Sequence, residues 1–263
     1  MEGVTRINLI TLPAFTDNYI WLLHDGRAAV VVDPGDSVPV LDALDRLGLV
    51  LAHILVTHHH HDHVDGVQAL RPRLQGHVWG PADEALPPPW QPVVEGQVLE
   101  LLGMTFEVMR VPGHTLGHVA YLARHPAWTE PTLFCGDTLF SAGCGRLFEG
   151  TPAQMFASLS RLAALPPSTR VCCTHEYTVS NLRFAQAVEP RNEEIAAHLH
   201  HSERLRSADT PTLPSTIAVE LRVNPYLRCT EPDVIASALR AGATGTEPLA
   251  VFTALREWKN RFR

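Results

Sequence analysis

Residues 57–63 (Thr-His-His-His-His-Asp-His) are the part of this sequence whose residue types and spacing are best suited to chemistry. They follow an apolar run that predicts a buried strand, and strand ends are where α/β proteins build their sites. In extended backbone, side chains two residues apart point the same way, so His58 and His60 can face one metal ion. The chain should then turn into a helix, where Asp62 and His63 can serve a second ion. This segment therefore predicts a binuclear metal site.

Three further strand-like runs end in single residues that could complete this site. Taken singly, each of these residues is better explained as a hydrogen-bonded core or turn residue, and the histidine run alone could be a surface tract that sequesters metal. Taken together, they divide into two coordination shells that each leave room for a water molecule. The predicted ligands are His58, His60 and His114 for one ion, Asp62, His63 and His175 for the other, and Asp137 as a bridge between the two.

The elements that must position these residues change in type along the chain. Short β-branched runs between turn residues predict strands at 18–23, 28–32, 52–56, 104–111, 118–122 and 132–135. Helical periodicity predicts helices at 38–47 and 152–164, the second with Thr151 as its N-cap, and then at 179–188, 193–207, 233–241 and 251–262. The sequence therefore predicts two domains: an α/β domain over residues 1–173, which contains most of the predicted ligands, and a helical domain over residues 174–263.

Composition excludes several classes of partner. The formal net charge of -7 over 263 residues opposes general binding to nucleic acid, which needs a concentrated basic face. No apolar run approaches the roughly 20 residues that cross a membrane, and the first residues lack the pattern of a signal peptide. The five cysteines are odd in number and lack paired spacing, which favours reduced thiols. We expect a cytoplasmic protein without nucleic-acid or membrane partners, and a monomer.

Several motifs identify a family. The chain resembles glyoxalase II, the hydroxyacylglutathione hydrolase family of the metallo-β-lactamase superfamily, from about residue 18 to its end. The metal motif is shared across that superfamily, so it specifies fold and metal more than substrate. The more specific segments are Gly-Asp-Thr-Leu-Phe at 136–140, Ala-Gly-Cys-Gly-Arg at 142–146, Phe-Glu-Gly-Thr at 148–151, His-Glu-Tyr-Thr at 175–178 with Asn181, and the stretches 213–216, 224–228 and 255–262.

The resemblance implies both a fold and a reaction. The fold is an αββα metallo-β-lactamase sandwich followed by a smaller α-helical C-terminal domain. The substrate is an S-(2-hydroxyacyl)glutathione, typically S-D-lactoylglutathione, which is hydrolysed to glutathione and D-lactate in the second step of methylglyoxal detoxification. Two divalent metal ions are the implied cofactors, with zinc expected and iron or manganese as alternatives. The implied catalytic residues are Asp62 and Asp137, and the implied substrate-binding residues are Arg146, Tyr177, Arg256 and Lys259.

Elementary electrostatics agrees with that reaction. Two divalent ions bring four positive charges, of which Asp62, Asp137 and a hydroxide would neutralise three, so the centre stays positive and suits an anionic intermediate. A metal lowers the pKa of its bound water to about 7, so no strong base is needed. The leaving thiol has a pKa of about 8.5 and needs no dedicated acid. Arg256 and Lys259 lie three apart on a predicted helix and could hold a glutathione carboxylate together.

Two positions depart from the family pattern, and two other functions compete with it. Phe148 stands where some relatives carry tyrosine, which would remove a hydroxyl contact to glutathione worth about 1 kcal/mol. His61 occupies a variable motif position, where we expect it in the wall of the site. The first competing function is another enzyme of the superfamily, such as a persulfide dioxygenase, which should lack the full second metal site. The other is a non-catalytic metal-binding protein.

Overall fold

The structure of the protein is a computed structural model that describes residues 6–262. Two compact units make up the chain: residues 1–110 with 116–136 form unit 1, and residues 111–115 with 137–263 form unit 2. Each unit contains its own hydrophobic cluster. The predicted domain boundary at residues 173 and 174 stays a prediction. In the described part of the chain, no helix is long and apolar enough to cross a membrane.

Unit 1 contains a mixed six-stranded sheet with its strands in sequence order. The strands are β1 (Asn8–Ala14), β2 (Asn18–His24), β3 (Ala28–Val32), β4 (Val50–Leu55), β5 (Val78–Pro81) and β6 (Gln91–Val93). β1, β2 and β3 pair antiparallel, and β3 to β6 pair parallel. The central strands are buried on both faces, which explains why they consist of continuous apolar runs.

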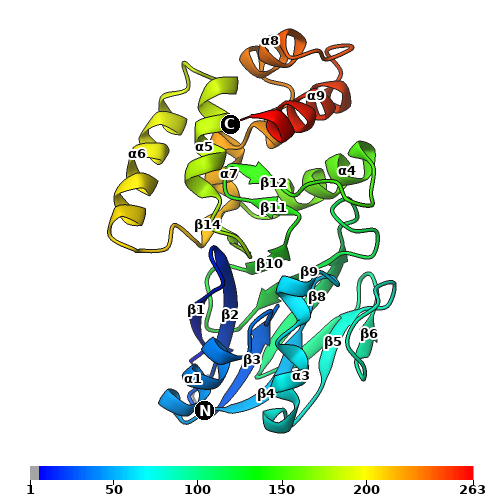
Figure 1. Cartoon of the computed structure of the whole chain (residues 1–263), viewed down its shortest axis with the longest axis vertical. Helices are drawn as coiled ribbons and strands as arrows, with labels where there is room; N and C mark the ends of the chain where they lie inside the picture. Colours follow the sequence, from blue (N-terminus) through cyan, green and yellow to red (C-terminus); the bar gives the residue numbers. More distant parts are fainter. Residues whose placement is uncertain (1–5, 263) are drawn as a thin grey trace. The chain divides into compact units, whose positions relative to one another are not determined.

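Short helices cover one face of this sheet (Figure 1). They are α1 (Val38–Leu47), α2 (His61–Val64), α3 (Val67–Leu70) and the 3-10 helix η1 (Arg71–Arg73). Val40 and Leu44 of α1 pack in one cluster with Ile20 and Leu22 of β2. α1 is capped at its C-terminus by Gly48, whose φ of 64° lies in the left-handed region that favours glycine.

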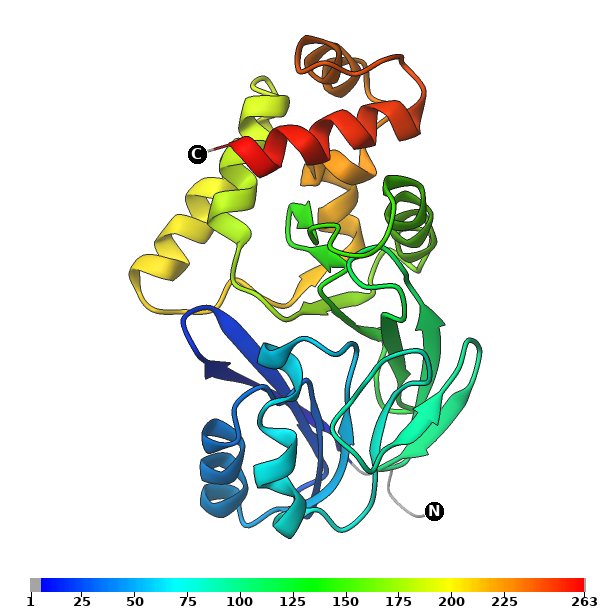
Figure 2. The same ribbon diagram turned by 45° about the vertical axis from the view of Figure 1, so that its right-hand side comes forward.

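Four antiparallel strands of unit 1 face the other side of the sheet. They are β7 (Val98–Leu101), β8 (Met104–Arg110), β9 (Val119–Arg124) and β10 (Thr132–Gly136). The ring of Trp21 on β2 lies 6.5 Å from the ring of Phe134 on β10. Tyr121 of β9 donates its hydroxyl hydrogen to the carbonyl of Val56, at 2.9 Å, just before the histidine run. Figure 2 shows the helices, the first sheet and these strands as successive layers.

Unit 2 is mainly helical. Its helices are α4 (Pro152–Ala163), α5 (Thr178–Val188), α6 (Glu193–Ser207), α7 (Ile217–Val223), the 3-10 helix η2 (Pro225–Leu227), α8 (Pro232–Arg240) and α9 (Pro248–Arg261). Two strand pairs accompany them: β11 (Leu139–Phe140) with β12 (Gly143–Cys144), and β13 (Arg170–Cys173) with β14 (Ser215–Thr216). α5 packs against α6 and α8, and α9 packs against α4 and α8.

The start of α4 confirms a prediction made from local sequence. Thr151 accepts a hydrogen bond from the backbone of Gln154, and the Gln154 side chain accepts one from the backbone of Thr151. This reciprocal capping box satisfies two donors that the first helical turn would otherwise leave exposed. Pro152 follows at the first helical position, where its missing N–H costs nothing. α4 therefore begins where its sequence predicts.

Candidate metal and substrate site

The histidine run of unit 1 places its side chains as the two-residue alternation predicts. Nε2 of His58 lies 3.1 Å from Nδ1 of His60, so both rings present nitrogen atoms to one place. His59 points elsewhere, and its ring and backbone N–H contact the buried carboxylate of Glu84. His61 is exposed at the start of α2 and contacts Asp65, which differs from the expected position in the wall of the site.

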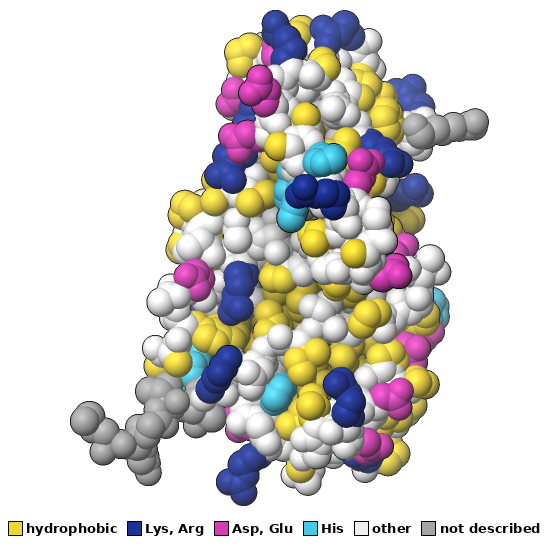
Figure 3. Space-filling view, turned by 90° about the vertical axis from the view of Figure 1, so that its left-hand side faces the viewer, with side chains coloured by type: hydrophobic (Ala, Val, Ile, Leu, Met, Phe, Trp, Pro, Cys, Tyr) yellow, Lys and Arg dark blue, Asp and Glu magenta, His cyan; other side chains and the backbone are white. Residues whose placement is uncertain are grey.

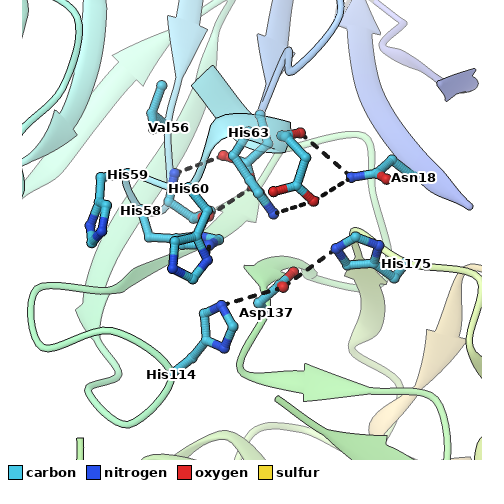
Figure 4. Close-up of polar contacts among 12 residues, drawn as sticks. Asn18, Val56, His58, His59, His60, His63, His114, Asp137 and His175 are labelled. Carbon is cyan, nitrogen blue, oxygen red and sulfur yellow. Dashed lines mark hydrogen bonds and ion pairs between the residues drawn. The ribbon is translucent and has the colours of Figure 1, made fainter. Parts of the chain in front are cut away.

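The turn into α2 brings Asp62 and His63 together. Oδ2 of Asp62 lies 3.7 Å from Nε2 of His63, whose side chain is fully buried. Asn18, the first residue of β2, donates its side-chain amide to Oδ2 of Asp62 at 2.9 Å (Figure 4). Asn18 was not among the predicted site residues, because it precedes Asp62 by 44 positions and belongs to another strand.

Asp33 supports the same cluster and was also missed. It follows β3 directly, is 2% exposed, and its Oδ2 lies 3.0 Å from Nδ1 of His63. The backbone N–H and the hydroxyl of Thr57 donate to the two oxygens of Asp33 at 2.7 and 2.8 Å. A carboxylate on Nδ1 fixes the proton there and leaves Nε2 of His63 as a ligand atom.

Replacing Asp33 with asparagine should weaken metal binding about 10- to 100-fold, the usual effect of losing such an outer contact. The asparagine amide would stand either at Oδ1, which accepts the Thr57 N–H, or at Oδ2, which meets the Thr57 hydroxyl and Nδ1 of His63, so at least one donor loses its acceptor. Competition with a chromophoric chelator measures this affinity. Asp45→Asn is the matched control, since Asp45 forms only an exposed ion pair with Arg73 in the same unit. Equal affinities in both variants would show that Asp33 does not support metal binding.

Unit 2 contains a second cluster of His114, Asp137 and His175. Oδ2 of Asp137 lies 3.5 Å from Nε2 of His114 and 3.4 Å from Nε2 of His175 (Figure 4). All three side chains are at least nine-tenths buried. Nδ1 of His114 lies 2.8 Å from the carbonyl oxygen of Arg146, which can only accept, so Nδ1 carries the proton and Nε2 is the ligand atom. A Cβ atom at residue 145 would overlap the carbonyl of Asp137, which explains the glycine there.

The donor sets of both clusters fit divalent transition-metal ions. Imidazole nitrogen and carboxylate oxygen are the ligands that zinc, iron and manganese share. Without a cation, several ligand atoms within 3.1 to 3.7 Å of one another would bring lone pairs of like polarity together. The predicted ligands thus fall into four residues of unit 1 and three of unit 2. His118, which is not a predicted ligand, follows His114 by four residues, and its ring stacks on that of His58 with centroids 4.6 Å apart.

A pocket of about 410 Å³ lies within unit 2 and contains every residue predicted to bind substrate. Its lining combines two candidate ligands, three aromatic rings and three cationic side chains. With Cys144, Ser180 and Asn181 added to these groups, the lining residues are His114, Asp137, Phe140, Cys144, Arg146, Phe148, Tyr177, Ser180, Asn181, Arg256 and Lys259. The pocket is therefore suited to an anionic molecule with an uncharged part near the ligand atoms.

Two of the three cations of the pocket donate hydrogen bonds to backbone oxygens. Nη1 of Arg256 donates to the carbonyl of Cys144 at 2.9 Å, and Arg256 is only 5% exposed. Nζ of Lys259 donates to the carbonyl of Ser180 at 3.0 Å. Burial, together with the charges of Arg256 and Arg146, lowers the pKa of Lys259 to about 8. An anion bound here would relieve that repulsion.

The aromatic rings of the pocket pack against the candidate metal ligands. The ring of Tyr177 stacks on His175 with centroids 4.7 Å apart and planes within 2° of parallel. Phe140 meets both rings edge-on, at 5.8 and 5.3 Å. Phe148, which lacks a hydroxyl, lies edge-on to His114 at 5.3 Å and is 63% exposed. Outside the pocket, the face in Figure 3 intersperses Lys and Arg with Asp and Glu.

Two family models together match nearly the whole chain. The metallo-beta-lactamase superfamily model matches residues 14–175, which include all seven predicted ligands, and the hydroxyacylglutathione hydrolase C-terminus model matches residues 176–262. Curated relatives named hydroxyacylglutathione hydrolase agree. One from Albidiferax ferrireducens is 55% identical over 97% of this chain and 100% of its own, and one from Vibrio parahaemolyticus is 51% identical over the same shares.

Solved structures support the same fold. A protein crystallised in a di-iron-bound form, TTHA1623, is 30% identical, with a TM-score of 0.58 over 84% of this chain and 100% of its own. ETHE1 from Myxococcus xanthus, at 24% identity, has a TM-score of 0.63 over 98% of this chain and 100% of its own. The predicted metallo-β-lactamase fold with a helical C-terminal domain is thus confirmed. The chain belongs to the hydroxyacylglutathione hydrolase family of the metallo-β-lactamase superfamily.

Proposed function

We propose that this protein is a metal-dependent thioester hydrolase that converts S-(2-hydroxyacyl)glutathione, typically S-D-lactoylglutathione, to glutathione and a 2-hydroxy acid. The observation that carries the proposal is the unit 2 pocket, in which Arg146, Arg256 and Lys259 share one cavity with His114 and Asp137. Glutathione supplies the carboxylates for the cations. Relatives at 55% identity over nearly the full chain support a hydroxyacylglutathione hydrolase over the two competing functions.

The metallo-β-lactamase fold and its His and Asp clusters support a binuclear site for divalent metal ions. We assign the seven predicted ligands to it, with Asp137 as the bridge, and zinc as the metal, because imidazole and carboxylate donors suit zinc well. The chemistry supplied at such a site is polarisation of the thioester carbonyl and hydroxide near neutral pH. The proposed ligands are His58, His60, Asp62, His63, His114, Asp137 and His175.

The protein's own residues would orient and bind. Asp62 and Asp137 each offer a carboxylate oxygen that can accept a hydrogen bond from the attacking water and so align it. Arg256 and Lys259 bind a part of the substrate that does not react, which places the thioester near the ligand atoms. The thiolate leaves without a general acid, since its pKa of about 8.5 makes it a good leaving group. Tyr177, stacked on His175, would pack against the peptide.

The pKa of Lys259 predicts how substrate affinity depends on pH. Lys259 is charged below pH 8 and loses its proton as the pH rises through about 8, so the attraction for a carboxylate should fade above that value. The dissociation constant of S-methylglutathione, measured by calorimetry from pH 6.5 to 9.5, should rise above pH 8. In Lys259→Met it should be higher throughout and lack this rise, apart from the titration of the ligand's own amine. The same pH profile in both proteins would show that Lys259 does not bind the carboxylate.

Hydrolysis of S-D-lactoylglutathione, measured before and after chelation with metal content determined on the same sample, tests the proposed function. We expect activity with about two metal ions per chain, loss of activity on chelation, and recovery on adding zinc. Two bound ions without hydrolysis would retain the metal site and refute the substrate. Hydrolysis that persists after complete removal of metal would refute the metal-dependent mechanism.

The cysteines and the net charge of the chain bear on its cellular setting. Each of the five cysteines is a buried thiol, which accords with the reducing conditions of the cytoplasm. The acidic composition opposes nucleic-acid binding, and we propose a monomer whose partner is the small thioester.

A further inference from the structure

The turn between β11 and β12 connects Phe140 and Cys144, which both line the pocket, and adopts an unusual backbone. Ala142 has a φ of 52°, in the left-handed region that a residue with a Cβ atom rarely adopts, and it is fully buried. Its methyl group packs in the core cluster of unit 2 with Leu182, Ala185 and Val223. Such a conformation persists only where surrounding contacts enforce it.

Glu220 of α7 supplies one of those contacts. The side chain is fully buried, and its Oε2 accepts the backbone N–H of Ala142 at 2.7 Å and the amide of Asn224 at 3.1 Å. The hydroxyl of Ser215 donates to the other oxygen, Oε1. Burying a carboxylate is costly, and three donors in a closed cluster offset that cost. The mechanism proposed above makes no use of this carboxylate.

Two side-chain amides bind the remaining backbone groups of the turn. The side-chain nitrogen of Asn224, whose two hydrogens are shared among three acceptors, also lies 3.2 and 2.9 Å from the carbonyl oxygens of Phe140 and Gly143. Asn181 of α5 donates to the carbonyl of Ser141 at 3.0 Å. Every residue of the turn is thus bonded through its backbone to a side chain of a helix or of the segment that follows it. Buried backbone groups need such partners, and here polar side chains replace strand pairing.

The hydrogen-bonded turn determines where two pocket-lining residues lie, Phe140 and Cys144. Phe140, at its start, packs edge-on against Tyr177 and His175. Cys144, just beyond its end, accepts the guanidinium of Arg256 with its carbonyl. Glu220 itself does not line the pocket. A change at Glu220 therefore reaches the substrate only by moving these two residues.

We propose that Glu220 is a positioning residue, which holds the Ala142 N–H and so sets the place of Phe140 and of the Arg256 anchor for the glutathione part of the substrate. This inference rests on the proposed function. Glu220, although it lies outside the pocket, would affect glutathione affinity. It would do so as a hydrogen-bond acceptor and not through its charge.

The test compares two replacements of similar size. Glu220→Gln keeps an oxygen for the Ala142 N–H and can turn its amide toward the Ser215 oxygen, whereas Glu220→Met keeps the volume and removes the acceptor. The dissociation constant of S-methylglutathione should rise about tenfold in Glu220→Met and change less than about threefold in Glu220→Gln. Metal content and kcat should stay within about twofold of the unsubstituted protein in both variants.

The matched control is Glu189→Met, which removes another buried carboxylate of unit 2, bonded to Arg228 at 2.8 Å. It should lower the melting temperature and leave glutathione affinity unchanged. Unchanged affinity in Glu220→Met, or equal losses in the Met and Gln variants, would overturn the inference. If Glu220→Met does not fold, Asn224→Ala replaces it, and unchanged affinity there counts equally against the proposal. An unsubstituted protein that fails to bind S-methylglutathione would instead overturn the proposed function.

Discussion

Replacing Asp137 with alanine should lower the metal content from about two ions per chain toward one and reduce kcat by at least about 10²- to 10³-fold. The reason is local: Oδ2 of Asp137 lies within 3.5 Å of the ligand nitrogens of both His114 and His175, so its loss removes the carboxylate that the two imidazoles share. Element analysis and steady-state kinetics on the same preparation measure both quantities.

The control for that variant is Asp233→Ala, the same change at an exposed ion pair with Arg191 in the same unit. It should leave both quantities unchanged. A metal content of two in Asp137→Ala would count against the bridging role even if turnover fell, because Asp137 would then act only on the attacking water.

Removing two of the three cations of the pocket should have the second-largest effect. In the double variant Arg256→Met with Lys259→Met, we expect KM for S-D-lactoylglutathione to rise at least about 100-fold, since a hydrogen bond to a charged group contributes about 1.5–3 kcal/mol. Turnover should change little, because these residues bind the same substrate group before and during the reaction. Steady-state kinetics over a wide substrate range separates KM from kcat.

The control is the double variant Arg240→Met with Arg261→Met, which removes two other positive charges from unit 2 and so changes the net charge equally. Arg240 bonds to Ser237 and Arg261 to the carbonyl of Glu257, and neither lines the pocket. This control therefore distinguishes contact from general electrostatic attraction, and its KM should stay within about twofold. A similar rise in both double variants would argue that net charge, not contact, governs affinity.

Much of the site could be predicted because local geometry determines it. Strand alternation correctly places His58 beside His60 and turns His59 away, and the motif from Gly136 onward correctly identifies the family. The helices at 38–47 and 193–207 match α1 and α6 to the residue. For the histidine run and for each of these helices, the determining pattern lies within one short stretch of chain.

The contacts that support the site could not be predicted in this way. Asn18, Asp33 and Glu84 reach the histidine run from positions 24 to 44 residues away, and neither their type nor their spacing distinguishes them from surface residues. The sequence does not indicate that Glu220 is buried either, because α7 has only seven residues and is too short for a clear helical period. β1 was missed too, since its partly exposed side chains give it no continuous apolar run.

The residues that line the pocket come from distant parts of the sequence, which limits where the chain could be cut into functional fragments. The pocket combines Val111–Thr115, through His114, with residues from Asp137 onward, whereas the C-terminal family model begins only at residue 176. A fragment cut at that boundary would retain Tyr177, Arg256 and Lys259 and lose Phe140, Cys144 and Arg146. The helical segment is therefore not a transferable glutathione-binding cassette, and recombination between relatives at residue 175 would have to preserve both halves of one cavity together.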